Sequence, residues 1–160
     1  MLNSDYKDML RVLSGHNVRF MLVGGYAFSA HGHPRGTLDI DFFIEATQEN
    51  AEALWRALTE FGAPLASIGV SASDFARENF IYQVGVQPRR IDIITKIDGV
   101  EFPDAYARSV EAELDGIKLR VISLEDLLAN KKASGRPKDL VDVITIEHMM
   151  AQNQTKGNHA

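Results

Sequence analysis

The sequence has no cysteine among its 160 residues. This absence excludes a disulfide framework, a zinc site built from thiolates and a cysteine nucleophile. No apolar run approaches the roughly 18–20 residues that a membrane-spanning helix needs, so we expect no membrane partner. Residues 1–8 are polar and acidic, unlike the apolar core of a secretory signal. We find no internal repeat and no low-complexity tract. These absences together predict a soluble, cytoplasmic protein.

The sequence also has fewer basic than acidic residues. The 17 Lys and Arg stand against 22 Asp and Glu, which gives a formal net charge of -5. This balance argues against indiscriminate nucleic-acid binding, but it says nothing about local patches. The hydrophobic share of 45% and the charged share of 24% are ordinary for a globular chain of one domain. We predict a single domain over residues 1–152 and a flexible tail over 153–160.

Hydrophobic periodicity predicts helices mixed with short strands. We expect helices over residues 2–13, 26–31, 48–61, 123–133 and 138–152, a helical turn over 73–79, and strands over 18–23, 39–45, 80–86, 90–95, 110–114 and 117–121. Asp115-Gly116 is a hairpin signal between the last two strands. The predicted class is therefore α/β (α+β): one mixed sheet flanked by helices, with a C-terminal helical part over about 123–152.

The most informative segment is the strand that contains Asp39 and Asp41. Residues two apart on a strand share a face, so these two carboxylates point the same way and repel each other. Either one stays protonated, or a cation lies between them. A second strand places Asp92 between apolar residues, and it completes a three-carboxylate cluster if the two strands are neighbours. Oxygen ligands without cysteine favour magnesium or manganese. The alternative is structural: Asp39 caps a strand end and Asp92 pairs with Arg90.

Two glycines, Gly24 and Gly25, come directly after an apolar strand and open a short helical stretch. Glycine at such a turn lets backbone N–H groups approach a phosphate, although a strand-to-helix turn often needs glycine for its own geometry. The signal becomes stronger because Asp39 follows Gly25 by fourteen positions.

Positive charges concentrate late in the chain, at Lys131, Lys132, Arg136 and Lys138. Without them the rest of the chain carries -9, from the total of -5. These residues form either a solvated helical face or a contact for a triphosphate or an RNA backbone. The neighbouring Asp139 and Asp142 either orient the bases or lie in water.

Four further residues precede the acidic strand. Arg35 and Thr37 are candidates for a phosphate or acceptor contact, and the alternative for Arg35 is a pair with a surface acid. His31 and His33 lack a third ligand for zinc, so we expect a role at the helix end.

The motifs resemble the signature of the DNA polymerase β-like nucleotidyltransferase superfamily. Within it they are most similar to small bacterial nucleotidyltransferases of the AbiEii/AbiGii toxin type. The resemblance is carried by residues 23–27, 31–32, 35–41 and 130–142 and covers roughly residues 6–146. It implies a mixed sheet flanked by helices and a metal-dependent transfer of a nucleoside monophosphate from an NTP.

The resemblance also implies roles for particular residues. Asp39 and Asp41 would bind Mg²⁺ (or Mn²⁺), and Asp92 would share a metal and help to deprotonate the acceptor hydroxyl. The nucleotide-binding candidates are Gly24, Gly25, Arg35, Thr37, Lys131 and Arg136.

The predicted function is nucleotidyl transfer to an acceptor hydroxyl. Because the resemblance is to toxin-type members, the expected acceptor is RNA, such as a tRNA 3′ end, and the expected protein partner is an antitoxin. A protein hydroxyl is another acceptor. One rival is an antibiotic nucleotidyltransferase of the aminoglycoside or lincosamide type. The other is a non-catalytic nucleotide-binding or regulatory module, against which the presence of all three aspartates argues.

Overall fold

The structure is a computed structural model that describes residues 2–158. In chain order its elements are α1 (Ser4–Gly15), β1 (Phe20–Val23), α2 (Gly25–Ala30), β2 (Asp39–Ile44), α3 (Gln48–Phe61), the 3-10 turns η1 (Ala66–Ile68) and η2 (Ala72–Ala76), β3 (Ile81–Val84), β4 (Arg90–Ile94), α4 (Phe102–Arg108), β5 (Val110–Leu114), β6 (Ile117–Val121), α5 (Leu124–Ser134) and α6 (Pro137–Asn158).

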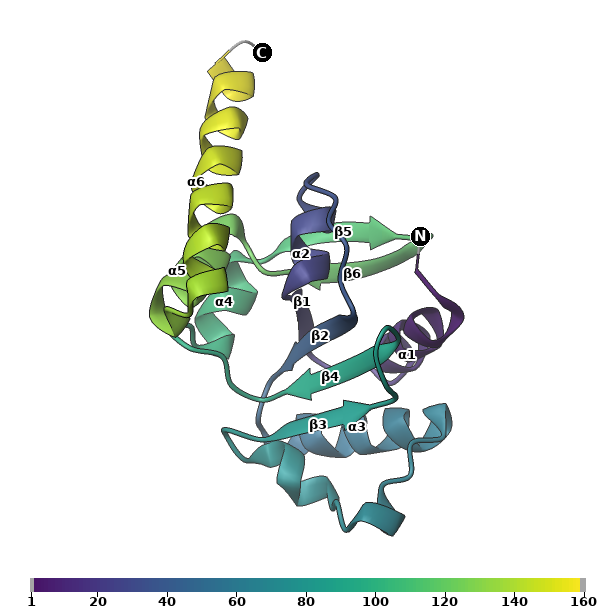
Figure 1. Cartoon of the computed structure of the whole chain (residues 1–160). Helices are drawn as coiled ribbons and strands as arrows, with labels where there is room; N and C mark the ends of the chain where they lie inside the picture. The colour runs from purple at the N-terminus through teal and green to yellow at the C-terminus, as the bar shows by residue number, and fades with distance from the viewer. Residues whose placement is uncertain (1, 159–160) are drawn as a thin grey trace.

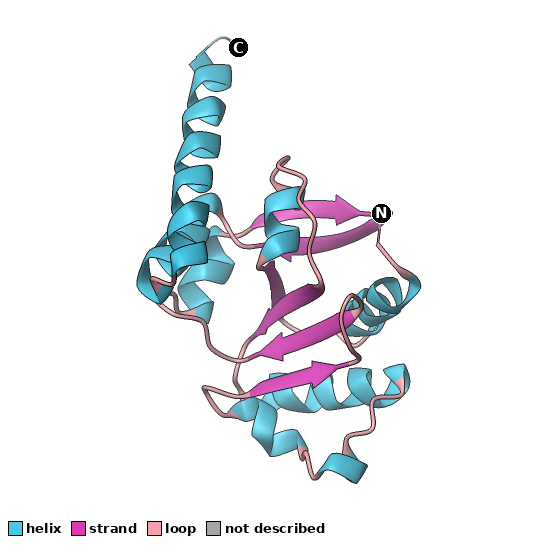
Figure 2. Ribbon diagram, viewed as in Figure 1, coloured by secondary structure: helices cyan, strands magenta, loops and turns pink. Residues whose placement is uncertain are grey.

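Six strands form one mixed sheet in the order β3-β4-β2-β1-β6-β5 (Figures 1 and 2). The β1/β6 and β2/β4 pairs are parallel, and the β1/β2, β3/β4 and β5/β6 pairs are antiparallel. Helices α1 and α3 lie behind the sheet in Figure 1, and α2 lies in front of it. The predicted mixed sheet flanked by helices is confirmed.

Strand β2 shows why one face of the sheet becomes core and the other carries the site. Ile40, Phe42 and Ile44 are fully buried. The intervening Asp39 and Asp41 point to the opposite face, because side chains alternate along a strand. The buried face thus fixes the register that presents both carboxylates together.

Side-chain caps begin two of the helices, and the predicted hairpin turn is confirmed. Thr47 caps α3 by accepting a hydrogen bond from the Asn50 amide, and Ser123 caps α5 in the same way from the Asp126 amide. Asp115 and Gly116 turn the β5–β6 hairpin with φ values of 50° and 82°, which the primed hairpin turns require.

Two features differ from expectation. Helix α4 was not predicted, because its seven residues are too few to show a clear helical period. Helix α6 continues through Asn158, whereas the sequence places its end at residue 152; residues 159–160 of the predicted tail lie outside the described residues. Figure 1 shows the C-terminal part of α6 projecting away from the sheet. The division into one domain and a tail stays a prediction.

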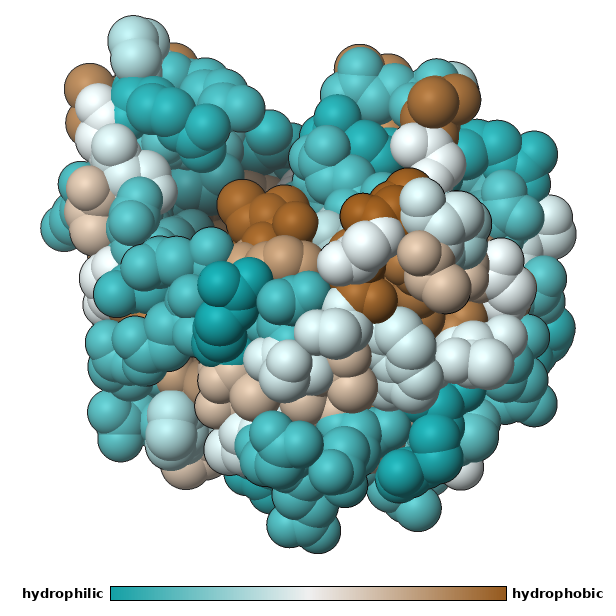
Figure 3. All heavy atoms as spheres, turned by 90° about the horizontal axis from the view of Figure 1, so that it is seen from below, coloured by the Kyte–Doolittle hydropathy of each residue, from teal (hydrophilic) through white to brown (hydrophobic). Residues whose placement is uncertain are grey.

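The surface is mostly hydrophilic on the face seen from below (Figure 3). Small hydrophobic patches interrupt it, and a notch hollows its upper edge in that view. None of the helices in the described part of the chain has the length and apolar character needed to cross a bilayer.

Candidate active site

The three predicted aspartates meet on the front face of the sheet. Parallel pairing of β2 with β4 sets Asp41 opposite Asp92, and Asp39 lies two residues earlier on β2. Each residue offers a carboxylate oxygen, and these oxygens all lie within 4.8 Å of one another. The expectation that the two strands are neighbours is confirmed, and so is the cluster that depends on it.

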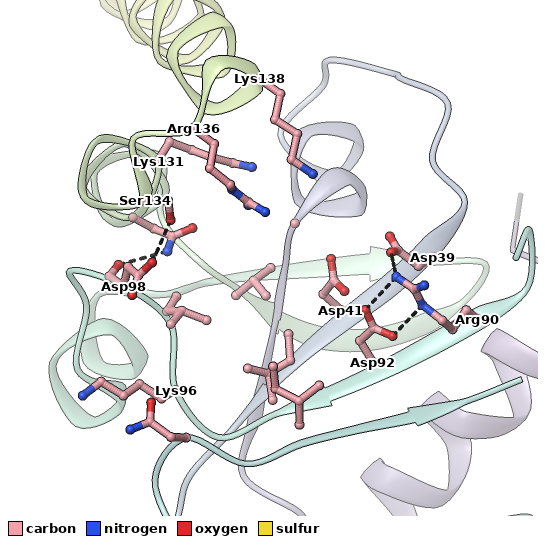
Figure 4. Close-up of a pocket in the computed structure, with 17 residues that line it drawn as sticks. Asp39, Asp41, Arg90, Asp92, Lys96, Asp98, Lys131, Ser134, Arg136 and Lys138 are labelled. Carbon is pink, nitrogen blue, oxygen red and sulfur yellow. Dashed lines mark hydrogen bonds and ion pairs between the residues drawn. The ribbon is translucent and has the colours of Figure 1, made fainter. Parts of the chain in front are cut away.

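Arg90 joins two members of the cluster (Figure 4). Its Nη2 lies 2.7 Å from Oδ2 of Asp39, and its Nε lies 2.9 Å from Oδ1 of Asp92. The pairing of Asp92 with Arg90, which we had treated as an alternative to a cluster, therefore occurs within the cluster. Sequence reasoning did not place Arg90 in the site. Its position two residues before Asp92 on the same strand was the available signal, since such residues share a face.

Asp41 receives neither of these ion pairs. Burial, followed by the negative charges of Asp39 and Asp92, raises the pKa of Asp41 from 3.8 to about 8, although Arg90 opposes the rise. In the protein without metal this carboxyl therefore keeps its proton to a higher pH than an ordinary aspartate does. Both solutions expected for crowded carboxylates have a counterpart here: the environment favours the protonated form of Asp41, and Asp39 and Asp92 share the guanidinium of Arg90.

The donor set fits a divalent metal ion. Three carboxylates and one guanidinium leave negative charge at the cluster, and every donor is an oxygen, which is the ligand that magnesium and manganese prefer. Asp39, Asp41 and Asp92 would hold such an ion, and its charge would favour the ionised form of Asp41.

The glycine pair allows β1 and α2 to approach this cluster. Gly24 has a φ of +70°, and a Cβ at this position would overlap Oδ2 of Asp41. A Cβ on Gly25 would lie 2.9 Å from Oγ1 of Thr37. Thr37 in turn donates hydrogen bonds from Oγ1 to the carbonyl oxygen of Asp39 at 3.0 Å and to its Oδ1 at 3.3 Å. Both glycines are thus required by close contacts around the carboxylates.

A cavity of about 590 Å³ extends from the cluster toward the start of α6. The carboxylates lie at one end, and Lys131, Arg136 and Lys138 line the other (Figure 4). Lys96, which follows β4, adds a fourth cation that sequence reasoning did not single out. The cavity therefore has an acidic end suited to metal and a basic end suited to phosphate.

Buried acids hold the basic end in place. Asp139 is fully buried and accepts from Nε of Arg136 at 2.7 Å, with Nζ of Lys131 at 3.5 Å. Asp142 binds Nζ of Lys131 at 3.0 Å and Nη1 of Arg35 at 2.8 Å. Burial opposes ionisation of Asp139, but the hydrogen bond from Arg136 and the charge of Lys131 keep the pKa of Asp139 below its ordinary value. Asp139 and Asp142 therefore orient the neighbouring basic side chains, which is one of the two roles expected for them from the sequence.

The other predicted residues lie nearby but outside this cavity. Arg35 has its guanidinium 4.4 Å from the centre of the Phe28 ring and is paired with Asp142, so it matches the expected pair with an acid, though with a buried one. Its contact with nucleotide stays a prediction. His31 is the C-cap residue of α2, which is the expected helix-end role, and its Nε2 lies 2.7 Å from the carbonyl oxygen of Ile122. Lys132 pairs with Glu147 at 3.7 Å.

Comparison with known proteins agrees with this geometry. A family model described as "Nucleotidyl transferase of unknown function (DUF2204)" matches residues 2–158. No curated protein matches the chain in sequence.

Solved structures share the fold. TM1012 from Thermotoga maritima, described as a candidate nucleotidyltransferase, is 18% identical with a TM-score of 0.58, covering 95% of this chain and 96% of its own. The solution structure of the antibiotic-resistance factor ANT(2'')-Ia is 14% identical with a TM-score of 0.55, covering 98% and 92%. A crystal structure of ANT(2'')-Ia in complex with adenylyl-2''-tobramycin is 16% identical with a TM-score of 0.50, covering 94% and 95%.

Proposed function

The chain belongs to the DUF2204 family of nucleotidyl transferases, and from this premise we propose that it moves a nucleoside monophosphate from an NTP to a hydroxyl group of RNA. The observation that carries the proposal is the cavity with two opposed ends. Three carboxylates within 4.8 Å form the acidic end, and Lys131, Arg136 and Lys138 form the basic end. A triphosphate with a bound metal ion carries the complementary charges, because its cation would meet the carboxylates and its phosphates would meet the basic end.

The residues divide the chemistry between them. An acceptor oxygen attacks the α-phosphorus, the bond from that phosphorus to the bridging oxygen of the β-phosphate breaks, and pyrophosphate leaves with the bond electrons. Asp92 takes the hydroxyl proton. Lys131 and Arg136 stabilise the negative charge that develops on the pyrophosphate. Magnesium held by Asp39, Asp41 and Asp92 supplies electrostatic stabilisation of the phosphoryl oxygens when it is bound.

The buried acids support the triphosphate contact. A lysine on an exposed helix samples many rotamers, whereas Lys131 has a side chain only 14% exposed and lies against two carboxylates. The same two carboxylates also pair with Arg35 and Arg136. Two negative charges therefore face three positive ones, and the basic end keeps a net positive charge. This arrangement is prepared for a polyanion before one binds.

RNA, such as a tRNA 3′ end, is the proposed acceptor. The fold is shared with ANT(2'')-Ia, whose complex contains an adenylylated aminoglycoside, so a cationic drug is the second candidate. A polycationic drug needs carboxylates beyond the three that hold metal. The cavity offers only Asp98 in this role, and Asp98 already accepts a hydrogen bond from Ser134 at 3.2 Å. Beyond the metal ligands, the cavity therefore lacks the free carboxylates that a polycationic acceptor would need, which favours RNA.

A transfer assay tests this proposal. The protein is incubated with each α-³²P-labelled NTP, Mg²⁺ and either total RNA or tobramycin, and the products are separated. We expect label on RNA that requires Mg²⁺ and disappears in Asp41→Asn, while the adjacent-charge control Lys132→Met keeps the activity. Label on tobramycin alone would assign the drug reaction. NTP binding without transfer to either acceptor would indicate a non-catalytic module.

The toxin role, with an antitoxin protein as partner, is a narrower proposal supported by the motif resemblance alone. Induced expression of the wild-type chain would stop growth of a bacterial host, and expression of Asp41→Asn would not. Equal growth of both cultures, with soluble protein present in each, would reject this role without affecting the transferase proposal.

A further inference from the structure

A second hollow of about 610 Å³ lies on the other side of the loop that leads into β2. It is bounded by α2, by this loop and by the turn of the β5–β6 hairpin. Its lining includes Leu2, Tyr26, Ser29, Pro34, Thr37 and Leu114. Nothing in the chemistry described above uses it.

This hollow adjoins the carboxylate cluster. Thr37 lines it and donates from Oγ1 to the Oδ1 of Asp39 at 3.3 Å. The ring of Tyr26 also lines it and lies 5.6 Å from the ring of Tyr6. The hydroxyl of Tyr6 donates to the carbonyl oxygen of Arg90 at 3.1 Å, on the strand that carries Asp92, so this aromatic pair lies close to the acids.

The hollow and the basic end of the cavity flank the cluster from opposite ends of the strands. Thr37 lies two residues before the first residue of β2. The basic end is anchored beyond the end of β4, where Asn130 and Ser134 of α5 bond to Asp98. In Figure 4 the strands run from Asp39 and Arg90 at one side toward Lys96 and Asp98 at the other, where Lys131 and Arg136 also lie.

In phosphoryl transfer the attacking and leaving oxygens lie roughly in line on opposite sides of the phosphorus. If pyrophosphate leaves toward Lys131 and Arg136, the acceptor must approach from the side of Thr37. We propose that this second hollow is the acceptor subsite and that it holds the 3′-terminal nucleoside of a single-stranded RNA. The inference rests on the proposed function and adds the place and chemistry of acceptor binding.

The lining suits a nucleoside better than a cationic drug. Its two charged side chains are already paired: Arg35 with Asp142 at 2.8 Å, and Asp115 with the backbone N–H of Leu2 at 2.7 Å and with Lys7 at 3.8 Å. The hollow thus has no spare carboxylate for an ammonium group.

What the hollow offers is an aromatic ring, apolar surface and hydroxyl groups. The Tyr26 ring provides a stacking surface for a base, Leu2 and Leu114 provide apolar contacts, and Ser29 and Thr37 provide hydroxyls that can bond to a ribose. Arg35 pairs with Asp142 through Nη1 alone and its side chain is 36% exposed, so its other N–H groups can meet the backbone phosphate of the preceding nucleotide.

Binding measurements on the full chain test this assignment. The probe is a 5′-fluorescein-labelled, ten-nucleotide single-stranded RNA of mixed sequence with a free 3′ hydroxyl, titrated by anisotropy in the presence of Mg²⁺ and a non-hydrolysable NTP. The affinity for Mg²⁺–NTP is measured separately by calorimetry. We expect Tyr26→Ala to weaken RNA binding about tenfold or more, the loss for one unstacked base, and to leave NTP affinity unchanged. Tyr26→Phe keeps the ring and therefore the RNA affinity.

Controls separate the subsite from general damage. Tyr106→Ala removes a half-buried tyrosine stacked on Phe102, away from the second hollow, and should leave RNA affinity unchanged. If thermal melting shows that Tyr26→Ala is unfolded, Ser29→Glu replaces it, since a carboxylate in the hollow repels RNA but not NTP.

Each other outcome has a definite meaning. RNA affinity that is unchanged in the folded Tyr26 and Ser29 variants overturns the subsite, and so does a loss of NTP affinity in Tyr26→Ala. Binding of tobramycin that Tyr26→Ala weakens, without RNA binding by the wild type, overturns the assigned ligand. A wild-type chain that binds no Mg²⁺–NTP overturns the proposed function itself.

Discussion

Replacement of Asp41 by asparagine should stabilise the metal-free protein while it removes activity. The pKa of Asp41 is raised from 3.8 to about 8 by burial and by the charges of Asp39 and Asp92. In the unfolded chain this carboxyl ionises near 3.8, so between these values the native state binds one more proton than the unfolded state. Stability therefore falls as pH rises through this window, by at most about 1.4 kcal/mol per pH unit.

The full difference of about four pH units would correspond to ~6 kcal/mol above pH 8. Asp41 is only partly buried, so water and salt screen the repulsion, and we expect about 2 kcal/mol. For a chain of this size that amount raises Tm by about 4–8 °C. Asparagine keeps the shape and carries no charge. The gain should be largest at pH 8.5, small at pH 4, and should vanish only below about pH 3, where both states of the wild type are protonated.

Urea unfolding followed by circular dichroism in EDTA, at pH 4, 6, 7 and 8.5, measures this difference. Asp142→Asn is the matched control of opposite sign, because Asp142 is buried but paired with Arg35 and Lys131, and its removal should destabilise the protein. Excess Mg²⁺ should stabilise the wild type and not Asp41→Asn. A difference between Asp41→Asn and wild type that is zero at pH 8.5, or the same at every pH, would refute the reasoning.

Three further substitutions test other parts of the site. Gly24→Ala should lower stability by about 1–2 kcal/mol, because its φ is +70°, and should abolish Mg²⁺–NTP binding in calorimetry, because the new Cβ displaces the Asp41 carboxylate. Lys131→Met should weaken NTP binding about tenfold or more, whereas Lys132→Met, exposed and paired away from the cavity, should not; equal effects would contradict the assigned contact. Arg90→Gln should increase Mn²⁺ affinity severalfold in electron paramagnetic resonance titrations, because Arg90 competes with the metal for two of the carboxylates. Arg89→Gln, at an exposed position, serves as control. A lower Mn²⁺ affinity in Arg90→Gln would show that Arg90 instead supports the metal site.

The carboxylates were predictable because a strand alternates its faces. Asp39 and Asp41 had to share a side, and Asp92 joined them once β4 lay beside β2 in parallel register. Caps at Thr47 and Ser123 were local signals of the same kind, written in a few adjacent residues.

What the sequence could not predict depends on contacts between distant segments. Asp142 lies 107 residues from its partner Arg35, so its burial in a charge network has no local signal. Helix α4 is short, and its Phe102 is buried against the ring of Phe43 of β2, whose centre lies 5.2 Å away. The order of the strands has the same origin, since pairing between remote segments is set by the whole core.

The central claim is that Asp39, Asp41 and Asp92 hold a metal ion against a triphosphate that reaches toward Lys131. A crystal of the wild-type protein grown with Mn²⁺ and a non-hydrolysable NTP tests it, because anomalous scattering locates manganese directly. We predict an anomalous peak about 2.1 Å from carboxylate oxygens of this cluster, with the phosphates between the peak and Lys131. Manganese bound elsewhere, or a triphosphate that avoids both the cluster and Lys131, would contradict the account.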